Sequence, residues 1–293
     1  MEPQTQQKHQ QLAAYACILG AAFLWGIIGI WNRRLMASGV SPMSIVVIRN
    51  IGSMLLFSAI FAVKDRSMFR VKREHLKYFF GTGVISVVLF TLCYFSCQKV
   101  CSLAVASILL YTAPSFVVIL SAILWKEPVT RKKVAALALT LVGCALVCGV
   151  FAGELAVTAA GILFGLGAGF FYALYSIFSR YALRHYSAIQ CTLWMFLFAG
   201  AASVFLIRPA ELAVLWNVEE GLTALILVVF STGSPFLLYT TGLSRVEAGK
   251  ASIIASFEPV IAALAGVLVF GEPMGASMIA GILCILAGVY ILR

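Results

Sequence analysis

The chain has 293 residues, of which 62% are hydrophobic and 11% are charged, and its formal net charge is +10. Soluble domains contain about 25% charged residues and roughly 45–50% apolar ones, so this composition excludes water as the main solvent. The positive charge does not indicate a nucleic-acid partner, because the basic residues lie in short gaps between long apolar runs and not on a folded basic surface.

The first apolar run covers residues 12–31 and follows a polar N-terminus. It is longer than the core of a usual signal peptide and is not followed by a convincing cleavage site, so we expect a retained helix. A bilayer core of about 30 Å takes about 20 helical residues to cross, and ten runs come within a few residues of that length. Because lipid offers the backbone no hydrogen-bond partners, each run should be helical. The expected spans are residues 12–31, 43–63, 78–97, 103–125, 134–151, 158–178, 188–207, 221–243, 249–270 and 275–292.

Ten spans place both termini on one side of the membrane, and the basic residues indicate which side this is. Sixteen of them lie at the termini or in the even-numbered loops: Lys8, Lys64, Arg66, Arg70, Lys72, Arg73, Lys77, Lys126, Arg131, Lys132, Lys133, Arg180, Arg184, Arg245, Lys250 and Arg293. Four lie on the opposite side: Arg33, Arg34, Lys99 and Arg208. We therefore expect both termini in the cytoplasm and the protein in the plasma (inner) membrane.

The chain repeats itself at a constant offset of 145 residues. The matching segments are Ala106-Ser107-Ile108 with Ala251-Ser252-Ile253, Pro114 with Pro259, Glu127-Pro128 with Glu272-Pro273, and Gly143 with Gly288. A half with five spans must enter the membrane in the opposite orientation from its partner, and the second copy has lost the basic cluster of residues 126–133. The fold class we expect is an all-α membrane protein of two inverted five-helix repeats, residues 1–151 and 152–293, around a central cavity.

These repeated motifs resemble the EamA half-domain of the drug/metabolite transporter superfamily. The resemblance extends over nearly the whole chain as two tandem halves, and it includes Trp25-Gly26 and Arg49. It implies ten helices around a central cavity, alternating access, and transport of amino acids, other small metabolites or drugs. At one position the halves differ: the second has Glu258 before its proline, where the first has Ala113.

Two charged residues inside the spans are candidate substrate-binding groups. Glu258 lies about 13 Å into its span at 1.5 Å per residue, where an ionisable group is costly and is by default a functional hypothesis. It could be a protonation site or an anchor for a substrate amine; alternatively, it is a structural carboxyl at the proline break. Arg49 could bind a carboxylate through two hydrogen bonds, or it could be a structural or snorkelling side chain. Together they would suit a zwitterion such as an amino acid.

Prolines and aromatic residues complete the candidate site. Proline within a span removes a backbone donor and can kink the helix, so we expect breaks or hinges at Pro114, Pro259 and Pro235, although such helices often tolerate proline. Aromatic side chains in the spans could line a pocket, although packing or interfacial anchoring is the more frequent role of any one of them. They are Trp25, Tyr94, Tyr111, Tyr172, Tyr175, Trp194 and Tyr239.

Other functions have less support in the sequence. A membrane-embedded enzyme or lipid-modifying protein is the alternative, but the three histidines lie outside the spans and the only aspartate is in a loop. Cys93, Cys97 and Cys101 are spaced by four residues, yet cysteine is usually a small apolar core residue, so we expect no metal and no cofactor. The sequence thus predicts a monomeric secondary transporter for a small zwitterion, cation or neutral aromatic metabolite. Protons are a candidate coupling ion, and export is the expected direction.

Overall fold

The computed structural model describes residues 2–149 and 157–292, and every regular element in these ranges is a helix. The boundary expected between residues 151 and 152 lies outside the described residues. The helices of the first half are α1 (Glu2–Gly26), α2 (Ile28–Ala37), α3 (Pro42–Lys64), α4 (Leu76–Phe80), α5 (Leu89–Val100), α6 (Leu103–Leu110), α7 (Ala113–Trp125) and α8 (Arg131–Val147). Two short 3₁₀ turns, η1 (Arg66–Phe69) and η2 (Arg73–His75), precede α4, and a π-helix, η3 (Gly81–Val88), joins α4 to α5.

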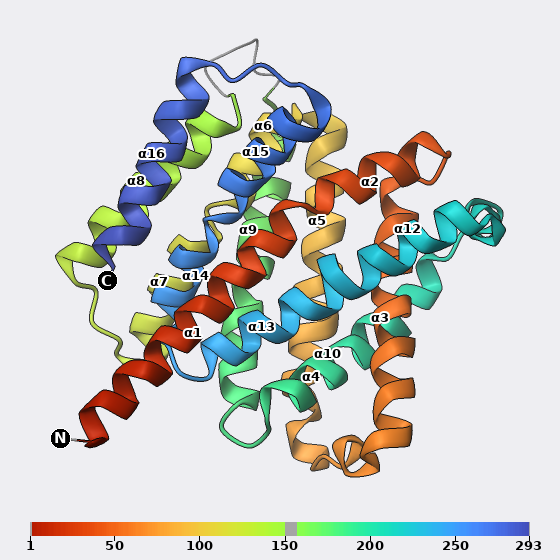
Figure 1. Cartoon of the computed structure of the whole chain (residues 1–293), viewed down its shortest axis with the longest axis horizontal. Helices are drawn as coiled ribbons and strands as arrows, with labels where there is room; N and C mark the ends of the chain where they lie inside the picture. The colour runs from red at the N-terminus through yellow and green to blue at the C-terminus, as the bar shows by residue number, and fades with distance from the viewer. Residues whose placement is uncertain (1, 150–156, 293) are drawn as a thin grey trace.

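The second half has the same order of long helices (Figure 1). They are α9 (Ala159–Ala182), α10 (Ala188–Ser203), α12 (Val218–Val228), α13 (Ser234–Leu243), α14 (Ala248–Ala255), α15 (Glu258–Phe270) and α16 (Ala276–Ile291). A π-helix, η6 (Val229–Gly233), joins α12 to α13, while η4 (Val204–Leu206), α11 (Pro209–Leu212) and η5 (Ala213–Trp216) form the connection after α10.

Eight segments are long and apolar enough to cross a membrane, so this is a multi-pass membrane protein. They are His9–Ala37, Pro42–Lys64, Arg73–Val100, Leu103–Trp125, Ala159–Ala182, Ala188–Leu206, Val218–Leu243 and Ala248–Phe270. Each corresponds to one of the ten expected spans. The other two expected spans, 134–151 and 275–292, are the shorter helices α8, with 17 residues, and α16, with 16.

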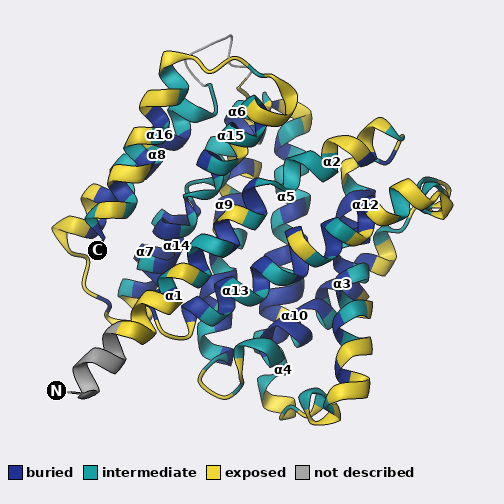
Figure 2. Cartoon of the chain, in the orientation of Figure 1, coloured by how far each residue is buried: buried dark blue, intermediate teal, exposed yellow. Residues whose placement is uncertain are grey.

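Buried side chains gather in the middle of the bundle, around α9, α13 and α14 (Figure 2). The outward faces of the surrounding helices carry large apolar side chains such as Leu163, Leu268 and Leu283, which are 72%, 81% and 60% exposed. A surface this apolar fits lipid and not water. Leu12 and Tyr15 of α1 line a groove together with Leu292, so α1 passes beside the end of α16.

Equivalent helices of the two halves run antiparallel where they meet. The helices α8 and α16 lie side by side at the edge of the bundle (Figure 1). A Cβ atom on Gly281 of α16 would lie 2.7 Å from the carbonyl oxygen of Gly143, and one on Gly288 would lie 2.9 Å from that of Ala136. The later residue of α16 thus contacts the earlier residue of α8, so the two helices are antiparallel. Small residues let the two backbones approach this closely.

The two equivalent interrupted spans, α6–α7 and α14–α15, also run antiparallel where α7 of the first meets α14 of the second. Glu127, just beyond the end of α7, lies near Gly249 at the start of α14. Pro114, at the start of α7, and Ala255, at the end of α14, line one cavity. The helices interrupted by proline are thus opposed head to tail.

Crowding at the contact between α8 and α16 predicts the effect of one added methyl group. Gly281→Ala should destabilise the protein by about 1–3 kcal/mol, because the new Cβ has no free space at the Gly143 carbonyl and the cost of overpacking has this size. The melting temperature of the purified protein in mild detergent measures the effect. Gly29→Ala is the matched control, since nothing lies within 4 Å of a Cβ at Gly29; equal melting temperatures for the two variants would contradict the prediction.

A loop carboxylate predicts a pH-dependent contribution to stability. The backbone N–H of Ser41 donates to Glu211 Oε2 at 2.8 Å and Arg208 Nη1 donates to Oε1 at 3.1 Å. The hydrogen bonds from Ser41, followed by the contact with Arg208, lower the pKa of Glu211 to about 2. In the unfolded chain a glutamate titrates near pKa ~4.3. The stabilising contribution is therefore complete above that value and is lost as the pH falls toward about 2.

We accordingly expect Glu211→Gln to lose less stability than the wild type between pH 5 and pH 2, because the amide does not titrate. Melting temperatures measured across this pH range provide the comparison. Parallel curves for the two proteins would show that the Glu211 carboxylate makes no such contribution.

Candidate functional site

A small cavity lies in the middle of the bundle, between helices of both halves. Its volume is about 30 Å³, and its walls come from α1, α7, α9, α13 and α14. One water needs about 10–15 Å³ of such volume, so the cavity has room for water but not for a metabolite in this conformation. The lining residues are Trp25, Ala113, Pro114, Val117, Tyr172, Ala173, Tyr175, Ser176, Tyr239, Ser252 and Ala255.

Aromatic rings form the main wall of this cavity, and four of the seven aromatic residues named from the sequence are among them: Trp25, Tyr172, Tyr175 and Tyr239. The Trp25 ring meets Tyr239 at a centroid distance of 5.6 Å, and the Tyr175 ring meets Tyr239 at 6.0 Å. Hydroxyl pairs hold two of the tyrosines, with Tyr175 Oη 2.6 Å from Thr240 Oγ1 and Tyr239 Oη 2.7 Å from Ser176 Oγ. The rings therefore have fixed positions around the space.

Both prolines of the repeat lie at the start of a helix that follows an interruption. The break between α6 and α7 falls at residues 111–112, and the break between α14 and α15 falls at 256–257, again 145 residues later. Pro114 and Pro259 are each the second residue of the new helix, where a missing N–H costs nothing. Pro235 has the same place in α13, directly after the π-helix η6. The helix is interrupted near Pro114 and Pro259, whereas at Pro235 it continues from the π-helix into α13. The role of the three prolines as hinges stays a prediction.

Arg49 lies in the middle of α3 and points into the protein. Its Nε donates to Thr232 Oγ1, in η6, at 3.0 Å. Thr232 Oγ1 in turn donates to the Leu227 carbonyl across the π turn. The wider turn thus brings a hydroxyl to the guanidinium, and the remaining guanidinium N–H groups have no partner among the described residues.

Glu258 is the first residue of α15, at the break in the last interrupted helix. Its carboxylate forms no hydrogen bond and no ion pair with any residue that the structure describes, and the side chain is partly exposed. Arg49 and Glu258 form no ion pair with each other, and neither is among the residues that line the cavity. Glu258 is nevertheless close to it, because its carbonyl lies 2.8 Å from a Cβ built on Gly26, which follows the lining residue Trp25.

The remaining candidates are farther from the cavity. Trp194 donates its indole N–H to the Met68 carbonyl at 3.2 Å and stacks on Phe79, so it anchors the loop after α3. Tyr94 is paired with Ser107 at 3.3 Å, and Tyr111 packs with the cluster around Val260 at the first helix break. Among the described residues, no group of three or more His, Cys, Asp or Glu side chains is placed to hold a metal ion.

Small hydroxyl residues of the site escaped the sequence analysis. Ser176 and Ser252 line the cavity, and Thr232 and Thr240 hold Arg49 and Tyr175. Serine and threonine are frequent in membrane helices, and an isolated one carries no sign of its partner. The useful signal was the polar run Ser231-Thr232-Gly233-Ser234, which is unusual for a span.

The two halves of the chain match one family of membrane proteins. Residues 12–149 and residues 159–293 each match the EamA-like transporter family. The chain belongs to this family. An uncharacterized transporter of Archaeoglobus fulgidus is 31% identical over 278 residues, which cover 94% of each chain. The uncharacterized transporter YoaV of Bacillus subtilis is 24% identical, over 93% of this chain and 94% of its own length.

Membership in the EamA-like transporter family makes this protein a membrane transporter and favours that class over an enzyme. The uncharacterized inner membrane transporter YicL of Salmonella typhimurium is also similar, with 24% identity over 94% of this chain. One solved structure superimposes with a TM-score of 0.79 at 20% identity and covers 95% of both chains, so the two proteins share one fold over nearly their whole length.

Proposed function

We propose that this protein is a secondary transporter for a small zwitterion such as an amino acid, with Arg49 and Glu258 as the groups that bind its two charges. The observation that carries the proposal is that these two ionisable groups are unpaired: each lies within an apolar span, and neither forms an ion pair with any residue that the structure describes. An unpaired charge in a span is costly, so a ligand that supplies the opposite charge would relieve that cost.

Transport by alternating access fits the size of the cavity. A space of about 30 Å³ between the halves must expand before a metabolite can enter. The antiparallel pairing of α8 with α16 and of α7 with α14 supports ten crossings arranged as two inverted repeats, a design that gives one central site two openings. We further propose that both termini are cytoplasmic, in line with the basic loops, and that the protein acts as an exporter in the plasma (inner) membrane.

The aromatic wall of the cavity indicates which side chains the substrate could carry. Trp25, Tyr172 and Tyr239 present ring faces that bind apolar groups and cations. A zwitterion with an aromatic or aliphatic side chain would therefore fill the expanded cavity better than a phosphorylated sugar, for which Arg49 alone supplies little positive charge.

Glu258→Gln tests the protonation role. Proteoliposomes are screened with a panel of amino acids and amines. Transport driven by a pH gradient should fall by about tenfold or more, because glutamine does not titrate and cannot carry a proton. Exchange without a gradient should persist, with a weaker affinity for substrates that carry an amine, because the amide cannot form an ion pair with it. Glu74→Gln, which changes an exposed loop carboxylate, is the control. Unchanged coupling in Glu258→Gln would refute the proton role.

Arg49→Gln tests recognition of a carboxylate. A charge-assisted hydrogen bond contributes about 1.5–3 kcal/mol, so the wild type should prefer an amino acid to its amide by roughly ten- to a hundredfold. Competition by each ligand for transport or for binding gives this ratio in both proteins. The preference should disappear in Arg49→Gln; an equal preference in both proteins would show that the carboxylate is read elsewhere.

A further inference from the structure

Each half of the chain ends its fourth span with the same backbone cap, and this cap positions a glutamate. Lys126 and Gly271 both adopt the left-handed conformation, with φ of 54° and 67°. The next residue then donates its N–H to a carbonyl six positions earlier: Glu127 to Ser121 at 3.4 Å, and Glu272 to Gly266 at 3.2 Å. A left-handed residue just past the last turn is a frequent way to end a helix. This cap fixes the two glutamates in equivalent places at the C-terminal ends of α7 and α15.

Each of these glutamates binds an arginine that belongs to the other half of the chain. Arg180 Nη1 of α9 lies 2.5 Å from Glu127 Oε1, and Arg33 Nη2 of α2 lies 2.5 Å from Glu272 Oε1. Both arginines lie near the end of the first span of their half. The ion pairs are thus exchanged between the halves: α9 of the second half is tied to α7 of the first, and α2 of the first half is tied to α15 of the second.

The arginines also stack on equivalent aromatic rings. The Arg180 guanidinium carbon lies 4.9 Å from the centroid of the Trp125 ring, and that of Arg33 lies 4.2 Å from the Phe270 ring. Trp125 and Phe270 are again 145 residues apart, two positions before each glutamate. We call the group Trp125, Glu127 and Arg180 the basic-end clamp, and the group Phe270, Glu272 and Arg33 the opposite clamp. Stacking and ion pairing together restrict each arginine to one position.

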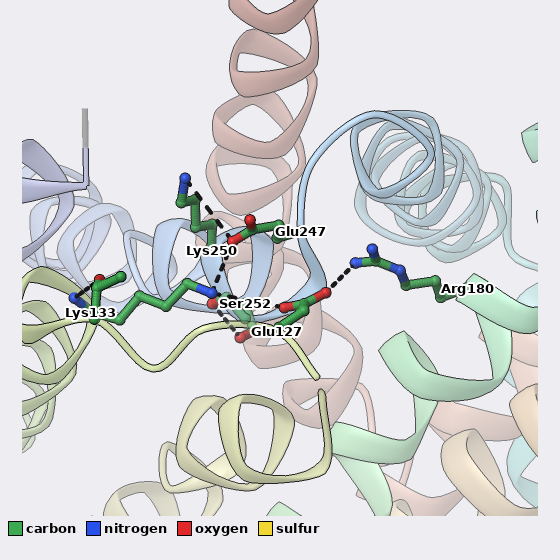
Figure 3. Close-up of polar contacts among 8 residues, drawn as sticks. Glu127, Lys133, Arg180, Glu247, Lys250 and Ser252 are labelled. Carbon is green, nitrogen blue, oxygen red and sulfur yellow. Dashed lines mark hydrogen bonds and ion pairs between the residues drawn. The ribbon is translucent and has the colours of Figure 1, made fainter. Parts of the chain in front are cut away.

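The two clamps differ in burial. In the basic-end clamp the Glu127 side chain is 7% exposed, whereas in the opposite clamp Arg33 and Glu272 are 52% and 39% exposed. Lys133, which is 3% exposed, adds a second cation 3.8 Å from Glu127 Oε2 and pairs with Glu247 at 2.8 Å (Figure 3). Although burial opposes ionisation of Glu247, the Lys133 ammonium lowers its pKa below the usual value. The clamp and its neighbours therefore close this end of the bundle with paired charges.

Between the clamps, each first span touches an interrupted helix of the other half at a glycine. A Cβ on Gly26 of α1 would lie 2.8 Å from the Glu258 carbonyl, at the break before α15. A Cβ on Gly169 of α9 would lie 2.8 Å from the Leu109 carbonyl, at the break after α6. These close contacts lie at the level of the cavity, with one clamp beyond each. A helix that is packed closely at its middle and bound by an ion pair at one end can tilt about the close contact when the ion pair breaks.

We propose that the two clamps are the gates of the carrier, so that releasing Arg180 from Glu127 opens the basic end and releasing Arg33 from Glu272 opens the opposite end. This inference rests on the proposed transport function and adds the residues that control access to its site. In the present conformation the basic-end gate is sealed within the protein, and the opposite gate is closed only by a solvated ion pair.

Hydrogen exchange of the whole protein in lipid nanodiscs tests the gates without any substrate. Arg180→Gln should raise amide exchange by about tenfold or more in residues 126–133 and 244–250, because removing one partner of a buried ion pair is strongly destabilising there. Exchange in residues 271–275 should not change. Arg33→Gln, the matched variant, should raise exchange only at residues 271–275, and by at most about fivefold, because exposed pairs are weak.

Three results would overturn the gate assignment: unchanged exchange at the basic end in Arg180→Gln, an equal rise at both ends, or a response of the basic end to Arg33→Gln. If Arg180→Gln does not fold, Trp125→Leu keeps the ion pair and removes the ring beneath Arg180. It should give a smaller rise at the same end, and no rise would likewise overturn the proposal. Because exchange needs no substrate, these outcomes stand apart from the transport assays: zwitterion transport without end-specific exchange would refute the gates alone.

Discussion

The structure depends on one constraint, which is that a backbone crossing lipid must satisfy its own hydrogen bonds. Every long segment of the described chain is helical for this reason. Within the spans, the breaks at residues 111–112 and 256–257 and the π-helices η3 and η6 pack against other helices. The wide turn of η6 brings Thr232 to Arg49, and Glu258 follows the break before α15. The irregular backbone of the spans is thus covered by protein and not by lipid.

The internal duplication places the helix breaks at equivalent positions of the two halves. One offset relates the helix breaks, the left-handed caps, the glutamates after them and the aromatic rings before them. Because equivalent helices run antiparallel, a feature that closes one end of the bundle in one half has its counterpart at the other end. Two of the differences between the halves fall at these features: the second half has Glu258 where the first has Ala113, and only the first half has a lysine, Lys133, beside its clamp.

Hydropathy and the repeat predicted most of the fold. The expected span 103–125 coincides with the observed segment Leu103–Trp125, and the prolines marked the interruptions. The polar start of α1 was not predicted, because hydropathy detects the lipid-crossing part of a helix and not its extension beyond the lipid. The π-helices η3 and η6 were not predicted, because a single wider turn does not change the hydrophobic pattern of a span. Trp194 looked like a lining residue because its sequence surroundings are apolar, but its N–H partner, Met68, comes from a distant loop. The pairing of Arg180 with Glu127 likewise needs knowledge of which helices are neighbours.

The left-handed cap at Lys126 has a consequence for how such a duplicated chain diverges. A left-handed residue other than glycine costs roughly 1 kcal/mol, and the equivalent position in the second half is Gly271, which avoids that cost. Lysine at this position belongs to the basic cluster of residues 126–133, and such clusters are typical of cytoplasmic loops. Two requirements therefore act on this position: a low conformational free energy favours glycine, and a positively charged loop favours lysine. The first copy has lysine and the second has glycine. In the first copy, a positive charge is thus combined with a backbone conformation that glycine adopts at a lower cost in free energy.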